Sequence, residues 1–143
     1  MTPIKFKRLH PAAVMPTYAT DGSACFDFYA TGDFAVHPFM TAAIKTELKA
    51  EIPRGYALML YGRSGMALNN GISLANCVGV IDSDYRGEIV ILLRNGSDDR
   101  HMIYAGDRIA QGMLIQVPSV KIIEVDEISE TGRGEGGFGS TGT

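Results

Sequence analysis

The sequence predicts one all-β domain followed by a glycine-rich C-terminal arm. Apolar and polar residues alternate in short blocks, and turn signals such as Asp21-Gly22 and Arg86-Gly87 separate the blocks about every ten residues. This pattern is typical of a β-sandwich or a β-barrel. The 143 residues suffice for one core, and the 17 glycines exceed the usual share of about 7%.

The alternating blocks predict the strands in order. They cover residues 4–6, 26–28, 44–48, 56–60, 89–93, the surroundings of Ile109, and residues 122–125. Only residues 64–71 favour a helix, because Ser64 is a good N-cap residue and Gly71 can end a helix in the left-handed conformation. We therefore expect residues 1–128 to form a single domain that is almost entirely strand.

Charge and composition exclude several functional classes. Thirteen basic and sixteen acidic residues give a net charge of −3 without a basic run, so binding to nucleic acid is not expected. No stretch approaches the ~20 apolar residues of a membrane span, and the first residues lack the apolar core of a secretory signal. Two cysteines, Cys25 and Cys77, are too few for a disulfide framework. We expect a cytoplasmic protein in a reduced compartment, with no nucleic-acid or membrane partner.

Residues 129–143 form the expected arm. They contain six of the seventeen glycines, a density at which neither a helix nor a strand is stable. A flexible terminus without function is one interpretation. However, Arg133 and Phe138 place a cation and an aromatic ring among these glycines, which favours an arm that closes over an anionic ligand.

Two segments could bind or process a phosphate. Residues 62–65 follow an apolar block and open the expected helix, so their N–H groups and the Arg63 guanidinium could meet a phosphate. Taken alone, the segment is explained more simply by a turn with a capped short helix. Asp82 emerges where an apolar run gives way to a turn. It is either a general base for water or an Asx-turn residue.

Two further side chains could complete a nucleotide site. Asn76 lies within an apolar run, where its amide must bond either a base or the backbone. Asp27 lies between aromatic residues in a strand and could hold a hydrated Mg²⁺, or it could simply face solvent. A general base, a phosphate cradle, an amide, a metal carboxylate and a closing arm together indicate chemistry on a nucleoside triphosphate.

Five segments, in this order, resemble the motifs of the homotrimeric deoxyuridine triphosphatase (dUTPase) family. They are ACFDFY (24–29), GRSGMA (62–67), GVIDSDYRG (79–87), GDRIAQ (106–111) and RGEGGFGSTG (133–142). The resemblance covers nearly the whole chain. It implies a β-barrel of jelly-roll type, a homotrimer, and sites at the subunit interfaces to which the arm is contributed across subunits.

The resemblance also implies roles for individual residues. Asp82 would be the base that deprotonates water for attack on the α-phosphorus of dUTP, which gives dUMP and pyrophosphate, and Asp27 would hold Mg²⁺ through a water molecule. The implied contacts on the phosphate side are Arg63, Ser64, Gly65 and Gln111 and, from the arm, Arg133, Gly139, Ser140 and Thr141. Positioning and charge neutralisation supply most of the catalysis in such a site.

Selection of uracil and deoxyribose is implied in the same way. The tight hairpin of Gly79, Val80 and Ile81 would read the uracil edge, with the Asn76 amide alongside, and would leave no room for a thymine methyl group. Tyr85 would lie under the deoxyribose, where a 2′-hydroxyl collides. Phe138 would stack on the uracil when the arm closes.

Two positions depart from the family pattern, and two other functions stay open. The pair Cys25-Phe26 replaces a smaller or aliphatic pair, and Gly112 replaces an apolar residue, which we expect to loosen its strand. A dCTP deaminase would share the fold but needs a catalytic glutamate where this chain has Leu92, which cannot transfer protons. The other alternative is a dUTPase-like chain that acts as a nucleotide-gated signalling or interaction protein.

Overall fold

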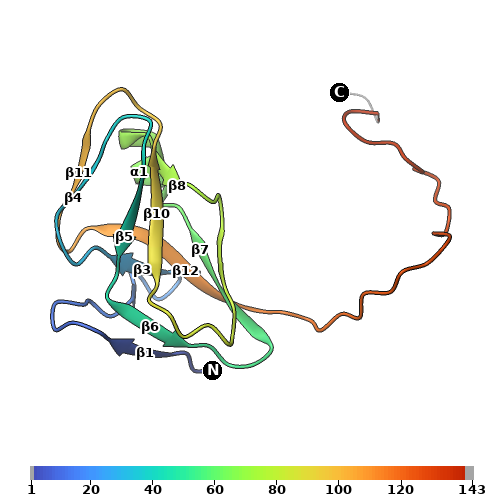
Figure 1. Ribbon diagram of the computed structural model, residues 1–143, viewed down its shortest axis with the longest axis horizontal. Helices are drawn as coiled ribbons and strands as arrows, with labels where there is room; N and C mark the ends of the chain where they lie inside the picture. Colours follow the sequence, from blue (N-terminus) through green and yellow to red (C-terminus); the bar gives the residue numbers. More distant parts are fainter. Residues whose placement is uncertain (1, 141–143) are drawn as a thin grey trace.

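The computed structural model describes residues 2–140, which form a strand-rich body and an extended C-terminal segment (Figure 1). The body contains one short helix, α1 (Ser64–Asn70), within the described residues. Its strands are β1 (Lys5–Arg8), β2 (Thr17–Tyr18), β3 (Phe26–Tyr29), β4 (Phe34–Val36), β5 (Thr41–Lys45), β6 (Leu48–Glu51), β7 (Tyr56–Tyr61), β8 (Ile72–Leu74), β9 (Gly79–Ile81), β10 (Val90–Asn95), β11 (His101–Ile103) and β12 (Arg108–Gln116). Within residues 2–140, no helix is long and apolar enough to cross a membrane.

A five-stranded sheet organises the body. Its order is β2-β3-β12-β7-β9, and the other strands form the sheet β5-β10-β8 and the pairs β1-β6 and β11-β4. Neighbouring strands are antiparallel throughout. In Figure 1, β1 and β6 lie at one end of the body and α1 at the other. This arrangement confirms the predicted all-β, jelly-roll-like fold with one short helix.

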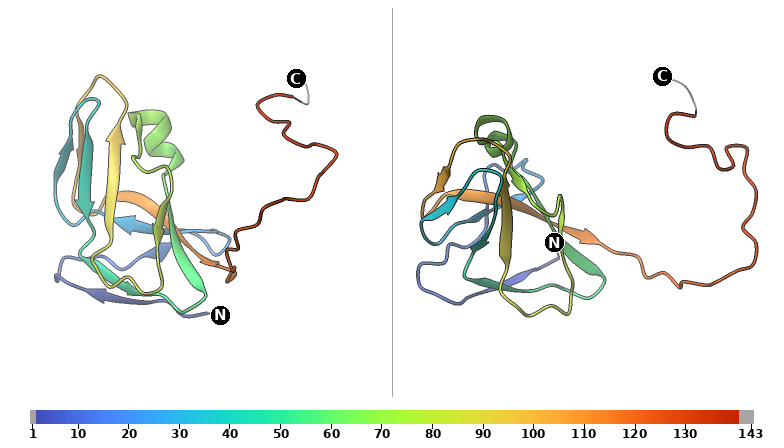
Figure 2. Two further views of the ribbon diagram at one scale, coloured as in Figure 1. Left: turned by 45° about the vertical axis from the view of Figure 1, so that its right-hand side comes forward. Right: turned by 45° about the horizontal axis from the view of Figure 1, so that its top comes forward.

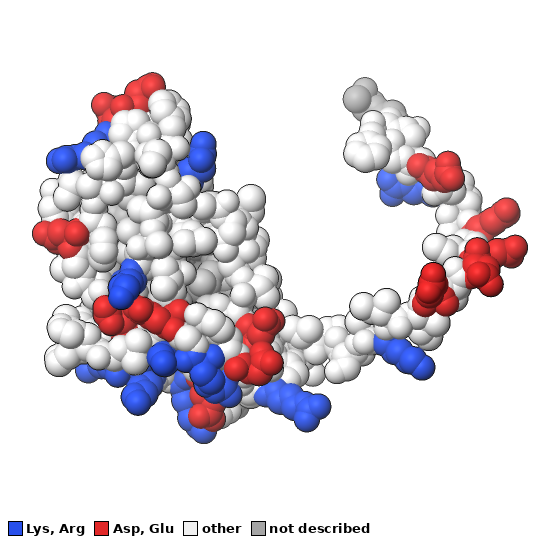
Figure 3. Space-filling model, in the orientation of Figure 1, with Lys and Arg blue, Asp and Glu red and all other residues white. Residues whose placement is uncertain are grey.

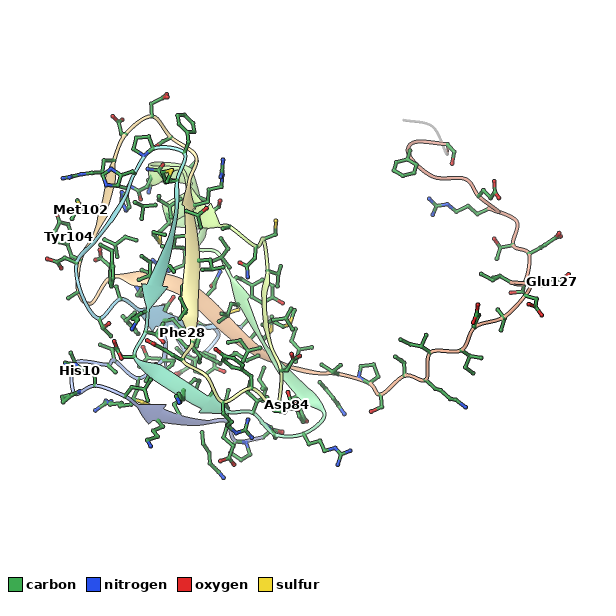
Figure 4. The ribbon with its side chains drawn as sticks, viewed as in Figure 1. His10, Phe28, Asp84, Met102, Tyr104 and Glu127 are labelled. Atoms are coloured by element: carbon green, nitrogen blue, oxygen red, sulfur yellow. The ribbon has the colours of Figure 1, made fainter. Side chains whose placement is uncertain are left out.

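Burial alternates along the strands and produces the core, even on β10, where the first four residues are all apolar. On β10, Ile91 and Leu93 are buried, whereas Leu92 and Arg94 between and beyond them are exposed. Phe28, labelled in Figure 4, is fully buried in the same core. Burial of each such side chain stabilises the fold by about 1.5–3 kcal/mol.

Gly112 and Phe26 compensate for each other. They are direct partners across β12 and β3, and a Cβ atom at position 112 would lie 2.7 Å from the Phe28 ring and 2.9 Å from the Phe26 ring. The two rings therefore fill the space that a side chain at position 112 would need. The expectation that Gly112 loosens its strand is wrong, because this part of the sheet is closely packed.

The start of α1 differs from the prediction, and its end agrees with it. Arg63 is the N-cap residue, with an extended backbone and no side-chain cap bond, so the prediction of Ser64 as N-cap is wrong. The chain leaves β7 in an extended conformation and stays extended through Arg63, and Ser64 becomes the first helical residue. Gly71 ends the helix in the left-handed conformation, at φ 64°, and donates to the carbonyls of Ala67 and Met66, as predicted.

The predicted strand at residues 122–125 is absent from the described chain. β12 ends at Gln116, and residues 117–140 leave the body as an extended segment, which both views of Figure 2 show. Its aliphatic side chains contact little: Ile122 is 94% exposed and Ile128 is 86% exposed. The extended segment thus starts at Val117, whereas the arm was expected to start at Ser129.

Candidate active site

The five-stranded sheet places two predicted site residues side by side. Asp27 on β3 is the direct partner of Gln111 on β12, and Gln111 is also paired with Tyr61, the last residue of β7. The chain continues from Tyr61 into residues 62–65, so the predicted phosphate cradle begins next to Gln111. The Gln111 amide donates a 2.9 Å hydrogen bond to the carbonyl of Gly62, which fixes the start of this segment.

Asp27 lies between two guanidinium groups. Its Oδ1 is 3.2 Å from Arg63 Nε, and its Oδ2 is 3.3 Å from Arg108 Nη1. Arg63 Nη1 also donates to the main-chain oxygen of Arg108 at 3.0 Å. Asp27 is only 7% exposed, so the alternative of a solvent-facing strand aspartate is wrong. One carboxylate and two guanidinium groups leave a local excess of positive charge, which attracts anions.

A cavity of about 480 Å³ opens onto this charged cluster, and we call it the phosphate cavity. Its lining is formed by Ala19, Ser23, Ala24, Cys25, Asp27, Arg63, Ser64, Gly65, Arg108 and Gln111. Partial burial, with a further contribution from Asp27, raises the pKa of the Cys25 thiol, so this group is an uncharged part of the wall. The structure therefore brings together five predicted residues, Asp27, Arg63, Ser64, Gly65 and Gln111.

Arg108 is a site residue that the sequence analysis missed. It lies in the segment GDRIAQ, for which only Gln111 received a role. The sequence does contain a signal for such a residue, namely an aspartate within an aromatic strand. If this strand is buried, the Asp27 carboxylate requires a cationic partner. Arg63 satisfies one of its oxygens, and the second cation had to come from a neighbouring strand.

The surroundings of Asp27 fit an indirect role in metal binding. Both carboxylate oxygens already face guanidinium groups, which leaves little room for a directly bound cation. Among residues 2–140, no group of three or more His, Cys, Asp or Glu side chains is arranged to hold a metal ion. A Mg²⁺ ion here would take most of its ligands from a bound phosphate and from water, with Asp27 acting through one of the waters.

A second cavity, of about 260 Å³, lies beside the turn between β8 and β9. We call it the base cavity, after the nucleobase that the sequence analysis expects here. It is lined by Leu60, Asn76, Gly79, Val80, Ile81, Asp82, Tyr85, Glu88, Ile89, Val90 and Leu92. The backbone is tight here, since a Cβ atom at position 79 would lie 3.0 Å from Leu60 Cβ and 3.4 Å from Asn76 Nδ2. Main-chain groups of β9 thus stand close to the cavity without a side chain at Gly79 to cover them.

Asn76 is placed differently from the prediction. It lies in the exposed turn after β8 and not inside a buried strand. Its amide therefore carries no cost of burial, and the premise that it lies in a buried run and must bond either a base or the backbone is wrong. The amide stands at the cavity edge, where it can still meet a ligand.

Asp82 follows β9 directly, where the sequence predicted the apolar run to end. It is exposed and lines the base cavity. The loop that follows is held by its own hydrogen bonds: the Tyr85 hydroxyl donates to the Glu88 carbonyl at 3.0 Å, and the Arg86 guanidinium donates to the carbonyls of Ser83 and Tyr85 at 2.8 and 2.9 Å. Asp82 and Tyr85 are therefore presented by a preorganised loop.

The predicted arm residues lie away from both cavities. Arg133, Phe138, Gly139 and Ser140 belong to the extended segment, which stands clear of the body in Figures 1 and 3. Phe138 is fully exposed, and Arg133 Nε donates to the carbonyl of Gly136 at 2.7 Å within the segment itself. Thr141 lies outside the described residues.

One chain thus presents its predicted site residues in three separate places. Over residues 2–140 the phosphate cavity and the base cavity share no lining residue, and no residue of the segment 117–140 lines either of them. Within the described residues, Asp82, the lining of the phosphate cavity and the extended segment therefore lie apart from one another.

Comparison with known proteins identifies the family. The dUTPase family model matches residues 12–142. A deoxyuridine 5′-triphosphate nucleotidohydrolase of Helicobacter pylori is 42% identical over 139 residues, which cover 97% of this chain and 96% of the relative; that of a Picosynechococcus species is 45% identical over 140 residues, with 98% and 99% covered. The structure of Staphylococcus bacteriophage 80alpha dUTPase with dUpNHpp superposes over the full length of both chains, with a TM-score of 0.88 and 26% identity. The chain belongs to the dUTPase family.

Proposed function

We propose that the chain hydrolyses dUTP to dUMP and pyrophosphate with Mg²⁺, and so limits uracil incorporation into DNA and supplies dUMP for thymidylate synthesis. The observation that carries this proposal is the position of Asp82, an exposed carboxylate at the edge of a cavity framed by the main chain of β9. Relatives of more than 40% identity over nearly the whole chain bear the name of this activity.

In this proposal Asp82 acts as the general base. Its carboxylate takes a proton from a water molecule, and the resulting hydroxide attacks the α-phosphorus in line with the bridging oxygen. The bond between the α-phosphorus and that oxygen breaks, so pyrophosphate leaves and dUMP remains. The loop bonds of Tyr85 and Arg86 fix the carboxylate before the substrate arrives, which lowers the cost of orientation.

The phosphate cavity supplies the charge for the triphosphate. Arg63 and Arg108 provide the positive excess around Asp27, and Ser64, Gly65 and Gln111 offer donors along the wall. Bound Mg²⁺ would neutralise and orient the phosphate oxygens, with Asp27 as the residue that holds it through water. From the arm, Arg133, Gly139, Ser140 and Thr141 would close the end of the triphosphate chain.

The base cavity accounts for the choice of nucleotide. The main chain of Gly79, Val80 and Ile81 would pair with the uracil edge beside the Asn76 amide, and Tyr85 would exclude a 2′-hydroxyl. Phe138 would stack on the base after closure. Leu92 also lines this cavity, so the position at which a deaminase needs a proton-carrying glutamate is apolar, which disfavours the deaminase alternative.

The separation of the three groups supports sites that are shared between chains, and the family resemblance implies that three chains assemble. The segment 117–140 contains 24 residues and can span up to about 80 Å when extended, which is enough to reach a neighbouring chain. Its part 117–128 exposes a run of aliphatic side chains that a second chain could bury: Val117, Val120, Ile122, Ile123, Val125 and Ile128. Docking of this part on a neighbour would leave the arm from residue 129 onward to close over the site, in keeping with the proposed division of the chain into residues 1–128 and 129–143.

Product analysis tests the activity. The protein is incubated with dUTP, dCTP, dTTP or UTP and Mg²⁺, and the products are separated by ion-exchange chromatography. We expect dUMP and pyrophosphate from dUTP and little turnover of the other three. Absence of dUMP would contradict the proposal, and conversion of dCTP to dUTP would favour a deaminase.

A matched pair of variants tests the role of Asp82 as the general base. Asp82→Asn should keep nucleotide binding and lower kcat by about 10²–10⁴-fold, because the amide cannot accept the proton from water. The control is Asp84→Asn, which removes the other carboxylate of the same loop. Asp84 lies close to the start of the arm (Figure 4), and its substitution should leave kcat unchanged. Equal losses in the two variants would show that loop charge matters and that Asp82 is not the base.

A further inference from the structure

Gly87 has a packing requirement that the proposed chemistry does not explain. A Cβ atom at position 87 would lie 2.8 Å from Tyr85 Cε2, and closer still to Tyr85 Cζ and Oη. Real Cβ atoms essentially never approach other heavy atoms this closely. The backbone of Gly87 does not adopt the left-handed conformation, and the three atoms nearest to the added Cβ all belong to Tyr85, so the Tyr85 side chain is the main obstacle to a side chain here.

The Tyr85 ring is held at a second point by its hydroxyl. That hydroxyl donates to the Glu88 carbonyl at 3.0 Å. Glu88 is itself anchored, because its Oε1 accepts the main-chain N–H of Glu47 at 3.0 Å, and its Oε2 lies 3.8 Å from Lys45 Nζ. The ring therefore rests on Gly87 and is tied through Glu88 to the turn between β5 and β6.

The remaining surface of the ring faces the base cavity. Tyr85 is 46% exposed and lines the base cavity together with Asp82 and Asn76. A cavity wall such as the Tyr85 ring excludes a slightly larger ligand only if the wall is rigid. A fixed ring makes a 2′-hydroxyl collide, whereas a ring that can move gives way at little cost.

From this geometry we propose that Gly87 is a specificity-determining residue, because the space it leaves empty fixes the Tyr85 ring against ribonucleotides. The inference rests on the proposed function, in which Tyr85 lies under the deoxyribose of dUTP. Any side chain at position 87 displaces the ring from its seat and breaks the bond between its hydroxyl and Glu88. Discrimination between dUTP and UTP is then lost before general activity is.

The test compares kcat/KM for dUTP with kcat/KM for UTP. In Gly87→Ala, the ratio of these two constants should fall by at least about tenfold, the lower end of what one steric contact contributes to specificity. Gly32→Ala is the matched control, because a Cβ there meets only the Phe34 ring at 3.8 Å, an ordinary contact, and its ratio should equal that of the wild type. An unchanged ratio in Gly87→Ala would overturn the inference.

A double-mutant cycle separates this role from a general effect on the loop. Tyr85→Ala removes the ring and should itself lower the ratio. Adding Gly87→Ala to Tyr85→Ala should cause no further change, since no ring is left to displace. An equal further fall in the double variant would overturn the inference.

Folding and basal activity give the remaining outcomes. If Gly87→Ala alone does not fold, the double variant should fold, because the clash is with Tyr85; failure of both would overturn the inference. A wild-type protein that does not hydrolyse dUTP contradicts the proposed function and removes the basis of this inference with it. A wild type that prefers dUTP, together with an unchanged ratio in Gly87→Ala, contradicts this inference alone.

Discussion

The body and the arm of this chain use aliphatic residues in opposite ways. On β10, alternate residues face the core and are buried, whereas in the segment 117–128 almost every aliphatic residue is exposed. Charge differs as well: residues 117–143 hold five of the sixteen acidic residues and two of the thirteen basic ones, so they account for the whole net charge of −3. Acidic side chains predominate along the arm in Figure 3. The body is a completed fold, and the arm has the properties of one half of an interface.

The largest expected effect comes from shortening the arm. Deletion of residues 132–143 removes Arg133 and Phe138 but leaves the body and the segment 117–128 intact. Turnover of dUTP should fall by about a hundredfold, because the triphosphate loses the groups that hold and enclose it. Size-exclusion chromatography with light scattering should still give three times the mass of the shortened chain, which is smaller than the 15.4 kDa of the full chain. Unchanged turnover would show that the arm is a linker.

A substitution inside the body should act on stability instead. Gly112→Ala pushes a Cβ into the rings of Phe26 and Phe28 and should lower the free energy of unfolding by about 1–3 kcal/mol, measured by urea denaturation. Phe26→Leu combined with Gly112→Ala should recover part of the loss, because a smaller side chain makes room for the methyl group. Additive losses in the double variant would contradict the compensation between these positions.

A smaller loss of stability is expected at the ion pairs of Asp27. Arg108→Gln leaves Asp27 Oδ2 without its cation and should cost about 1–2 kcal/mol, less than a fully buried pair because Arg108 is itself about half exposed. The control is Lys5→Ala, which breaks the exposed 2.6 Å pair between Lys5 and Glu51 and should cost less than about 0.5 kcal/mol. Similar losses for both variants would show that burial of Asp27 is unimportant.

Trypsin offers the mildest test, because it leaves the sequence unchanged and two of its cleavage sites, Lys121 and Arg133, lie in the arm. Docking of the segment 117–128 on a neighbouring chain should protect Lys121, while Arg133 stays open to cleavage in the free enzyme. Mass spectrometry of the fragments should detect a first cut after Arg133, which a non-hydrolysable dUTP analogue with Mg²⁺ should slow. Equal cutting after both residues would place the start of the free arm at Val117.

Most of the body was predictable because its strands pack against the same chain. Alternation identified the core of β10, and Gly71 ended α1 because only a left-handed residue fits there. Residues 122–125 were also predicted to be a strand, yet they form none in the described chain. A strand-like pattern of apolar residues shows that these side chains need a surface to pack against. It does not show whether the same chain or a neighbouring chain supplies that surface.

The site was predictable to the extent that it depends on local sequence. Asp82 lies at a strand end, as expected. In contrast, the place of Arg108 in the site and the exposure of Asn76 depend on which strands become neighbours. Register between β3 and β12, set by packing over many residues, brings Asp27 beside Gln111. Neither that pairing nor the wider set of ion pairs follows from spacing along the chain.

Complementation between inactive variants tests the division of the site among chains most directly. Asp82→Asn and the chain lacking residues 132–143 are unfolded together, refolded as a mixture and assayed for dUTP hydrolysis. If Asp82 and the arm of one site come from different chains, about a quarter of the sites in randomly mixed trimers contain both, and that share of wild-type activity should return. A mixture as inactive as its two parents would show that each site takes both groups from a single chain.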